Sequence, residues 1–278
     1  MKRYLFIAFA AFVLCACGGK KSTAVQESTP ADSSVVADST GAGLVDDELA
    51  DLPMPRAADE LFDDFIFNFA ASKKLQMERI RFPLKKVNGT RTETIEPGQW
   101  RMERYFMRQD FYTLIFDNEK QMEVVKDTSV NHAVVEMIYF NTGAVIQHVF
   151  DRLRGVWMLT SVETIPISQS PNGSFLTFYH QFATDPDFQQ HSLSESIAFE
   201  GPDPDDDFSR MDGVITPDTW EAFAPELPDR MLFNIIYGPA KPSGRQKIFV
   251  IRGIANGQEL ELTFRHQGDQ WRLTKMTM

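Results

Sequence analysis

The last strand of the chain has a near copy in the middle of the chain, and this repeat constrains the fold more than any other feature. The segment "DQWRLTKMTM" ends the chain, and "GVWMLTSVET" stands far upstream of it. Residues 132–164 align with 246–278 without a gap, and identical Gly, Phe, Trp, Leu and Thr residues keep one constant offset. Such self-similarity indicates a duplicated structural unit. The sequence therefore predicts two copies of one strand-rich unit.

The repeat also includes a helix ahead of each set of strands. Three phenylalanines per copy have i, i+3, i+7 spacing, which places them on one helical face. Ser72 and Asp185 occupy equivalent places as N-caps of a second short helix. The prediction is an α+β protein with two tandem domains, 57–165 and 171–278, each with helices followed by about four strands. The aligned rings are Phe62, Phe65 and Phe69 with Phe175, Phe178 and Phe182.

The closing motif resembles the ending of a known superfamily. Gly268 to Leu273 reads Gly-Asp-Gln-Trp-Arg-Leu, and the first copy keeps Gly155, Trp157 and Leu159 of it. This ending is similar to that of the nuclear transport factor 2-like superfamily. The resemblance implies two cone-shaped domains, in each of which helices pack on a curved antiparallel sheet. It also implies a tapering cavity suited to a small molecule, but it implies no particular activity.

The N-terminus has the pattern of an exported lipoprotein. Lys2 and Arg3 precede a short apolar run, and Leu14-Cys15-Ala16-Cys17 resembles a bacterial lipobox. We expect a signal peptide at 1–16, lipidation of Cys17 and a flexible tether at 17–56, which is rich in small and polar residues. The whole arrangement resembles a lipoprotein family of Bacteroides-type bacteria whose chemistry is not known. We therefore expect a protein of the cell envelope that is anchored to the membrane and faces the periplasm, with the outer surface as the alternative.

The charge and the cysteines exclude several classes of function. The formal net charge is −11, so no basic stripe is available for nucleic acid. No cysteine follows Cys17, and the histidines lack the spacing of a zinc site, so no disulfide, metal or other cofactor is indicated. The segment with Asp203, Asp205 and Asp207 lacks the glycine and glutamate of a calcium loop. We expect a solvated acidic loop there, and a basic patch from "RIRFPLKK" at the equivalent place of the first copy.

Four residues are candidates for lining a ligand pocket: Tyr139, His148, Tyr179 and Tyr237. His148 is in phase with apolar neighbours on its expected strand, so it is expected to face an interior. Glu136 and Tyr139 point to opposite faces of their strand, so at most one of them shares a face with His148. The alternative is that these residues are ordinary members of a core. The sequence shows no nucleophile motif and no catalytic constellation.

These observations predict a role in binding. The chain is expected to bind a small ligand or an envelope protein without catalysing a reaction. One alternative is an enzyme that performs acid/base chemistry in the cavity of one domain, as an isomerase, dehydratase or hydrolase would. Another alternative is a structural subunit of an envelope complex. The oligomeric state stays open, although the basic patch and the acidic loop could meet between domains or subunits.

Overall fold

The computed structural model describes residues 59–203, 206–239 and 244–278, and side-chain positions for all of these except 206–208. The predicted signal peptide, Cys17 and the tether lie outside the described residues. The helices are α2 (Phe62–Ala71), α3 (Lys73–Arg79), α4 (Glu119–Met122), α5 (Gly173–Thr184) and α6 (Pro186–His191). Short 3₁₀ turns are η2 (Pro97–Gln99), η3 (Tyr105–Arg108), η4 (Glu123–Lys126), η5 (Ile167–Gln169) and η6 (Trp220–Ala222).

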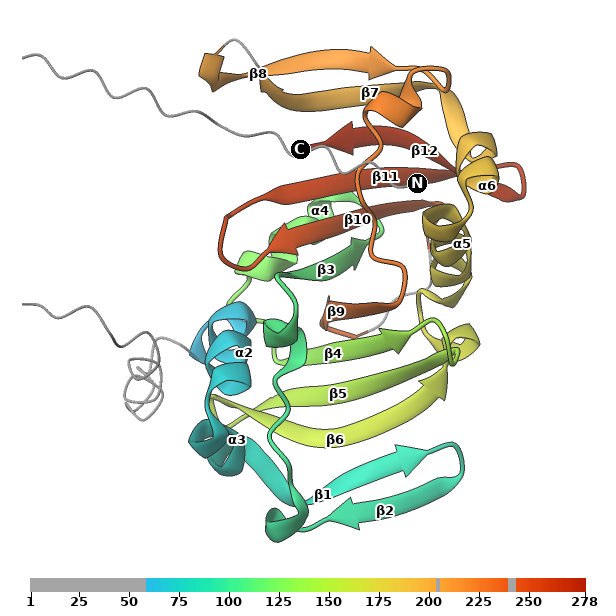
Figure 1. Ribbon diagram of the computed structural model, residues 1–278. Coiled ribbons are helices and arrows are strands. Elements are labelled where there is room, and N and C mark those ends of the chain that lie inside the picture. The colour runs from blue at the N-terminus through green and yellow to red at the C-terminus, as the bar shows by residue number, and fades with distance from the viewer. Residues whose placement is uncertain (1–58, 204–205, 240–243) are drawn as a thin grey trace, which may run out of the picture. The chain divides into compact units, whose positions relative to one another are not determined.

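Twelve strands form one mixed sheet, in the order β2-β1-β6-β5-β4-β9-β3-β10-β11-β12-β7-β8 (Figure 1). The strands of the first half are β1 (Ile80–Asn88), β2 (Arg91–Ile95), β3 (Phe111–Phe116), β4 (His132–Tyr139), β5 (Ala144–Leu153) and β6 (Val156–Pro166). Those of the second half are β7 (Leu193–Asp203), β8 (Asp206–Ile215), β9 (Met231–Tyr237), β10 (Gln246–Gly253), β11 (Glu259–Gln267) and β12 (Gln270–Thr277).

This single sheet differs from the predicted pair of antiparallel sheets of about four strands each. The two halves exchange one strand: β9 pairs with β4, and β3 pairs with β10. At the centre, β3 and β9 pair with each other in parallel. Both exchanged strands are short and apolar, "FYTLIF" and "MLFNIIY", so the period-2 pattern fits either neighbour equally well. The α+β class is confirmed, but the sheet is continuous.

The structure corrects a second prediction, that the segments with the basic patch and the acidic residues are variable connections; residues 204–205 of the acidic segment lie outside the described residues. These segments form the hairpins β1–β2 and β7–β8, which lie at opposite ends of the sheet. A contact between them within the chain is therefore ruled out. The closing strands β6 and β12 consequently lie inside the sheet, each paired in parallel with the first strand of its hairpin. Sequence alternation is hard to see in these hairpins because many of their side chains are exposed and charged on both faces.

Two separate aromatic cores lie on opposite faces of the sheet. Helix α2 covers the first core and α5 covers the second. On β4, Val135 belongs to the first core and Ile138 to the second. On β10, Val250 belongs to the first core and Phe249 to the second. Residues of opposite parity on one strand point to opposite faces, so each core uses central strands from both halves.

Polar contacts repeat between the halves as the aromatic pattern does. Gln76 Nε2 donates to the carbonyl of Phe69 at 2.9 Å, and its Oε1 accepts from Trp100 Nε1 at 3.0 Å. In the second half, Gln189 Nε2 donates to the carbonyl of Phe182 at 3.0 Å and its Oε1 accepts from Trp220 Nε1 at 2.8 Å. The predicted N-caps are confirmed as well. The hydroxyl of Ser72 accepts from the backbone N–H of Leu75, and the carboxylate of Asp185 accepts from those of Asp187 and Phe188.

Candidate functional site

The four predicted pocket residues do not share one site. Tyr139, His148 and Tyr237 lie on the face that carries the first core, whereas Tyr179 belongs to the second. The strand register also places Tyr139 on the face of His148 and Glu136 on the other face, as the alternation predicted. The hydroxyl of Tyr179 donates to the carbonyl of Pro228 at 2.9 Å, which fixes α5 to the loop that leads into β9.

His148 is buried in the first core without an ionic partner among the described residues. Its ring meets that of Tyr105 edge-on, with centroids 4.9 Å apart. Burial lowers the pKa of His148 to about 4, so the ring is neutral at pH 7. Its Nδ1 atom and the hydroxyl of Tyr105 are buried and make no hydrogen bond within the described part of the chain. Because the imidazole of His148 is buried, a substrate in the solvent does not contact it in this structure.

Tyr237 is buried, but its hydroxyl meets an ionisable group that is partly accessible to solvent. Its hydroxyl donates a short hydrogen bond to the Oδ1 atom of Asp63, near the start of α2. Burial raises the pKa of Asp63, while the hydrogen bond from Tyr237 opposes that rise. The pKa of Tyr237 is well above its ordinary value, because of burial first and of the Asp63 charge second. The helix in the second half has Leu176 where α2 has Asp63.

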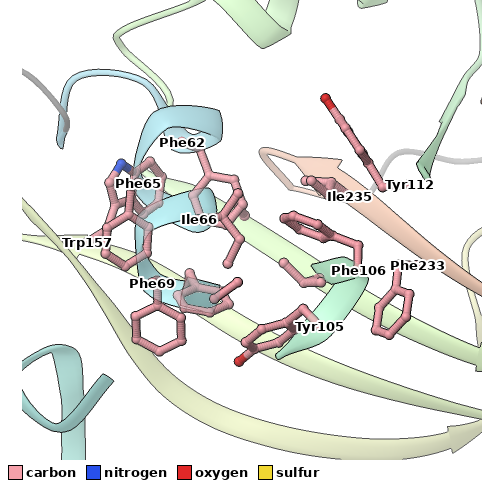
Figure 2. Close-up of a cluster of buried hydrophobic side chains, with 14 of the residues drawn as sticks. Phe62, Phe65, Ile66, Phe69, Tyr105, Phe106, Tyr112, Trp157, Phe233 and Ile235 are labelled. Carbon is pink, nitrogen blue, oxygen red and sulfur yellow. The ribbon is translucent and has the colours of Figure 1, made fainter. Parts of the chain in front are cut away.

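The same cluster continues outward to a charged pair. Arg252 Nη1 donates to the hydroxyl of Tyr112 at 3.4 Å, and Arg252 Nε pairs with Glu259. Burial raises the pKa of Tyr112 to about 12. Figure 2 shows the Tyr112 hydroxyl pointing away from the aromatic rings. Both phenols stay protonated at pH 7, and burial shifts the pKa of the Asp63 carboxyl upward from its ordinary value.

Sequence reasoning found Tyr237 but missed Asp63, Tyr112 and Arg252. The signal for Asp63 was present: it interrupts the apolar face that the equivalent helix keeps with Leu176. Tyr112 and Arg252 could not be connected to it, because they come together only through the exchange of β3 and β9.

A second polar cluster lies on the opposite face of the central strands. Glu136 is fully buried, and its carboxylate accepts from Gln147 at 3.0 Å, from Asn234 at 3.0 Å and from Ser170 at 3.4 Å. Burial raises the pKa of Glu136, and these three hydrogen bonds counteract the rise. Asn234 comes from the exchanged strand β9, so the cluster fastens the two halves together.

A buried lysine extends this cluster toward the second half. Lys247 Nζ donates to Asp117 at 2.6 Å and to Asn172 at 2.7 Å. The backbone N–H of Asn172 in turn donates to Ser170, which reaches Glu136. Each charge in this chain of contacts has a partner, as a stable buried ion requires. The arrangement is therefore a buried polar network with a structural role. Across the described residues, no three His, Cys, Asp or Glu side chains gather closely enough to hold a metal ion.

Aromatic side chains fill the interior beneath both main helices. In the first core, the ring of Phe62 lies 4.9 Å from that of Trp157 (Figure 2). The ring of Phe150 lies 5.4 Å from Phe62 and 5.3 Å from Phe69. The second core has the matching contacts. Phe264 lies 5.5 Å from Phe175 and 5.2 Å from Phe182, and Trp271 lies 5.7 Å from Phe175. The space in which a cone-shaped fold of this kind would hold a ligand is thus occupied by the protein's own rings.

Comparison with known proteins assigns the family. Residues 42–278 match the family described as a domain of unknown function, DUF4348. The chain belongs to this family. It is also similar to an NTF2-like protein from Bacteroides fragilis, with 39% identity and a TM-score of 0.73 over 81% of this chain and 98% of that one. The DUF4348 chain therefore has an NTF2-like fold, as the closing motif implied. No curated protein is similar enough to count as a match.

Proposed function

We propose that this DUF4348 protein is a lipid-anchored protein of the cell envelope that binds a partner protein on its surface and does not catalyse a reaction. The observation that carries the proposal is the aromatic filling of both cores. Phe62, Phe150 and Trp157 interlock at ring distances of 4.9 and 5.4 Å, and the second core repeats the arrangement. A ligand in either interior would have to displace these rings, so the exterior is the better candidate for binding.

Exposed apolar side chains at one end of the sheet support a surface role. Four of the six large exposed hydrophobic residues belong to the β8 end of the second half, and Phe223 packs on Phe199 with centroids 5.8 Å apart. Clustered exposed apolar groups commonly mark interaction surfaces. Met211 and Phe223 share the face that carries Phe199, whereas Val214 lies on the opposite face of β8. We call the group of Met211, Phe223 and Met278 the β8 patch.

The anchor in this proposal rests on the sequence. The lipobox around Cys17 and the small, polar tether would hold the folded part near a membrane and leave the β8 patch accessible. Within the described ranges, no helix is both long and apolar enough to cross a bilayer. Metabolic labelling with a clickable fatty acid tests the anchor: the full chain should be labelled and a Cys17→Ser variant should not.

Site-specific photo-crosslinking tests the binding role. A photoreactive phenylalanine analogue replaces Phe223 in the full chain in its own host, and the same analogue at Phe111, outside the β8 patch, is the control. The proposal expects a discrete protein adduct from position 223 and none from position 111. Absence of an adduct from 223, or equal adducts from both, would contradict it. A stoichiometric adduct with several envelope proteins would instead identify a structural subunit.

The second candidate function is acid/base chemistry at Asp63. It is favoured by the raised pKa of that carboxyl and by its position beside Tyr237 at the partly accessible edge of the first core. NMR titration of the Asp63 carboxyl carbon in the full chain tests it, with the neighbouring exposed Asp64 as the internal reference. A pKa of Asp63 in the ordinary range would remove the physical basis for this candidate.

We further propose that the halves descend from one duplicated α+β unit, the tandem organisation that the sequence predicts. The repeated contacts of Gln76 and Gln189 support this, as do the equivalent strand irregularities beside Phe150 and Phe264. The exchange of β3 and β9 then turned two units into one sheet.

A further inference from the structure

The strand β8 ends the sheet, and among the described residues it has a strand neighbour on one side alone, β7. An edge of this kind can accept another strand through its backbone groups, and proteins commonly block such edges with charges or irregularities. Over residues 210–215 the strand pairs regularly with β7, from Pro202↔Arg210 to Ile197↔Ile215. The edge is therefore a regular strand over this stretch, and its side chains decide what can pair with it.

Charges on β8 have a self-complementary order. Arg210 and Asp212 lie on one face of the strand, with Met211 between them on the other face. In an antiparallel pair of two β8 strands centred on Met211, Arg210 of each copy stands opposite Asp212 of the other. Directly opposed side chains lie about 5 Å apart at Cβ, close enough for two reciprocal ion pairs. In this register, the charges of Arg210 and Asp212 on one β8 strand are each paired with the opposite charge on an identical strand.

Apolar exposure on β8 supports the same register. Met211 is 40% exposed, and in this register it meets Met211 of the second copy on the face that carries Phe199. The ring of Phe199 lies over Gly201, the residue opposite Met211 on β7, and leaves no room for a Cβ there. The Met211 pair would thus join the two β8 patches into one covered apolar surface.

The present contacts of Arg210 leave it able to pair in this way. Its Nε donates to Glu200 at 3.1 Å and its Nη2 to the carbonyl of Met278 at 2.7 Å. These contacts direct the guanidinium over β7 toward the end of β12. Pairing with Asp212 of a second copy would turn the side chain toward the free side of β8, and a guanidinium has five N–H donors in all. Because the two strands run in opposite directions, their acidic N-terminal ends would lie at opposite ends of the seam.

The other edge strand, β2, is a poorer partner for β8. Eight of the eleven pairings across the sheet are antiparallel. Each antiparallel pairing reverses the strand direction, and an even number of reversals leaves the two edge strands, β2 and β8, running in the same direction. Joining β8 of one copy to β2 of another with like faces aligned would give a parallel pair. Arg91 and Glu93 could then not both face opposite charges on β8, because both strands carry the basic residue first.

We propose that two copies of this chain associate by antiparallel pairing of their β8 strands about a twofold axis at Met211. The partner in the proposed surface-binding role is then a second copy, so this inference rests on that role and narrows it. The result is a closed dimer with a sheet continuous through both copies, which follows the commonest symmetry of soluble oligomers.

Disulfide trapping in the full chain tests the pairing. Directly opposed residues in an antiparallel pair have Cα atoms roughly 4.5–5.5 Å apart, within the range of a disulfide. No cysteine follows Cys17, so a Met211→Cys variant has one new thiol in the folded part. We expect oxidation in membranes to give a linked dimer at least about tenfold more abundant than from the matched control Thr92→Cys, on the other edge strand β2. The parent chain controls for links through Cys15 and Cys17.

Charge variants in the Met211→Cys background test the register. Asp212→Arg places like charges at both ends of the seam, and we expect about tenfold less linked dimer. The double variant Arg210→Asp with Asp212→Arg restores opposite charges and should recover most of the link. Circular dichroism checks that each variant is folded.

Several outcomes would overturn the proposal. These are no link at position 211, an equal or stronger link at position 92, or no response to charge reversal. None of them affects the photo-crosslinking test at Phe223, where an adduct with a different protein would retain the surface-binding role and reject self-pairing. Absence of both the link and the adduct would reject both.

Discussion

At the scale of single residues, burial sets the charge of the ionisable groups in the cores. His148 and Glu136 lie on opposite faces of neighbouring strands, and burial disfavours the charged form of each. Glu136 has three hydrogen-bond donors that hold its carboxylate, whereas the described residues give His148 Nδ1 no partner. The Glu136 carboxylate therefore has a structural role, in which it holds neighbouring elements together by hydrogen bonds. The neutral imidazole of His148 packs as a ring in the core, and the described residues leave its Nδ1 atom without a hydrogen bond.

The pH dependence of stability should report His148. Its pKa is about 4 in the folded protein and near 6.5 when unfolded. Between these values the unfolded chain binds the proton and the folded chain does not, so stability falls as pH falls from 6.5 to 4. The loss is about 3 kcal/mol. A His148→Leu variant, which copies Leu262 of the second half, should lack this component in urea unfolding at pH 4.5 and 7. Exposed His191→Leu is the control and should keep it.

Replacing the Glu136 carboxylate by an amide should be tolerated, whereas removing the side chain should not. Glu136→Ala leaves Gln147, Asn234 and Ser170 without their acceptor, so we expect a loss of about 3 kcal/mol in the free energy of unfolding. Glu136→Gln keeps one acceptor and removes a buried charge, and should change it by less than about 1 kcal/mol. Chemical denaturation at pH 7 measures both. Equal losses would show that the negative charge itself is required.

At the scale of elements, the sequence predicted what local chemistry determines. The aromatic helices, their N-caps and the strands with Trp157 and Trp271 follow from spacing and cap residues, and all are present. Gly143 and Gly257, at equivalent places between β4 and β5 and between β10 and β11, have φ of 65° and 64°. The hairpins β1–β2 and β7–β8 were missed because their alternation is hidden by charge. The cluster around Asp63 was only partly predicted, because it depends on contacts between distant strands.

The two glutamine contacts should have similar energetic value if the elements are duplicated. Gln76→Ala and Gln189→Ala each remove a hydrogen bond to a helix carbonyl and another from a tryptophan. Gln76→Ala also removes two hydrogen bonds with the Glu103 backbone, so its loss should be the larger of the two. We expect each to destabilise the protein by about 2 kcal/mol or more in thermal or urea unfolding. Gln181→Ala, on the exposed side of α5, is the control and should stay within about 0.5 kcal/mol. A large effect at only one of the two positions would count against equivalent roles.

At the scale of the whole described fold, the strand exchange should make the halves unfold together. The first core includes Phe233 from β9, and the second includes Ile115 from β3. Phe69→Ala, which opens a cavity in the first core, should lower the free energy of unfolding by about 3–5 kcal/mol. The unfolding transition of the second core should shift by the same amount, because neither core is complete without strands of the other half. Fluorescence of variants that keep only Trp157 or only Trp271 measures each core. Two separated transitions would contradict this coupling.

The central claim is that the protein's own rings occupy both interiors, so that the DUF4348 fold acts through its surface. Native mass spectrometry of the full chain, released gently from the membranes of its own host, tests this most directly. The account predicts masses of the lipidated chain alone or in protein complexes, without a retained small molecule. A small molecule bound in stoichiometric amount and lost in a Phe65→Trp variant, which adds bulk beneath α2, would contradict it.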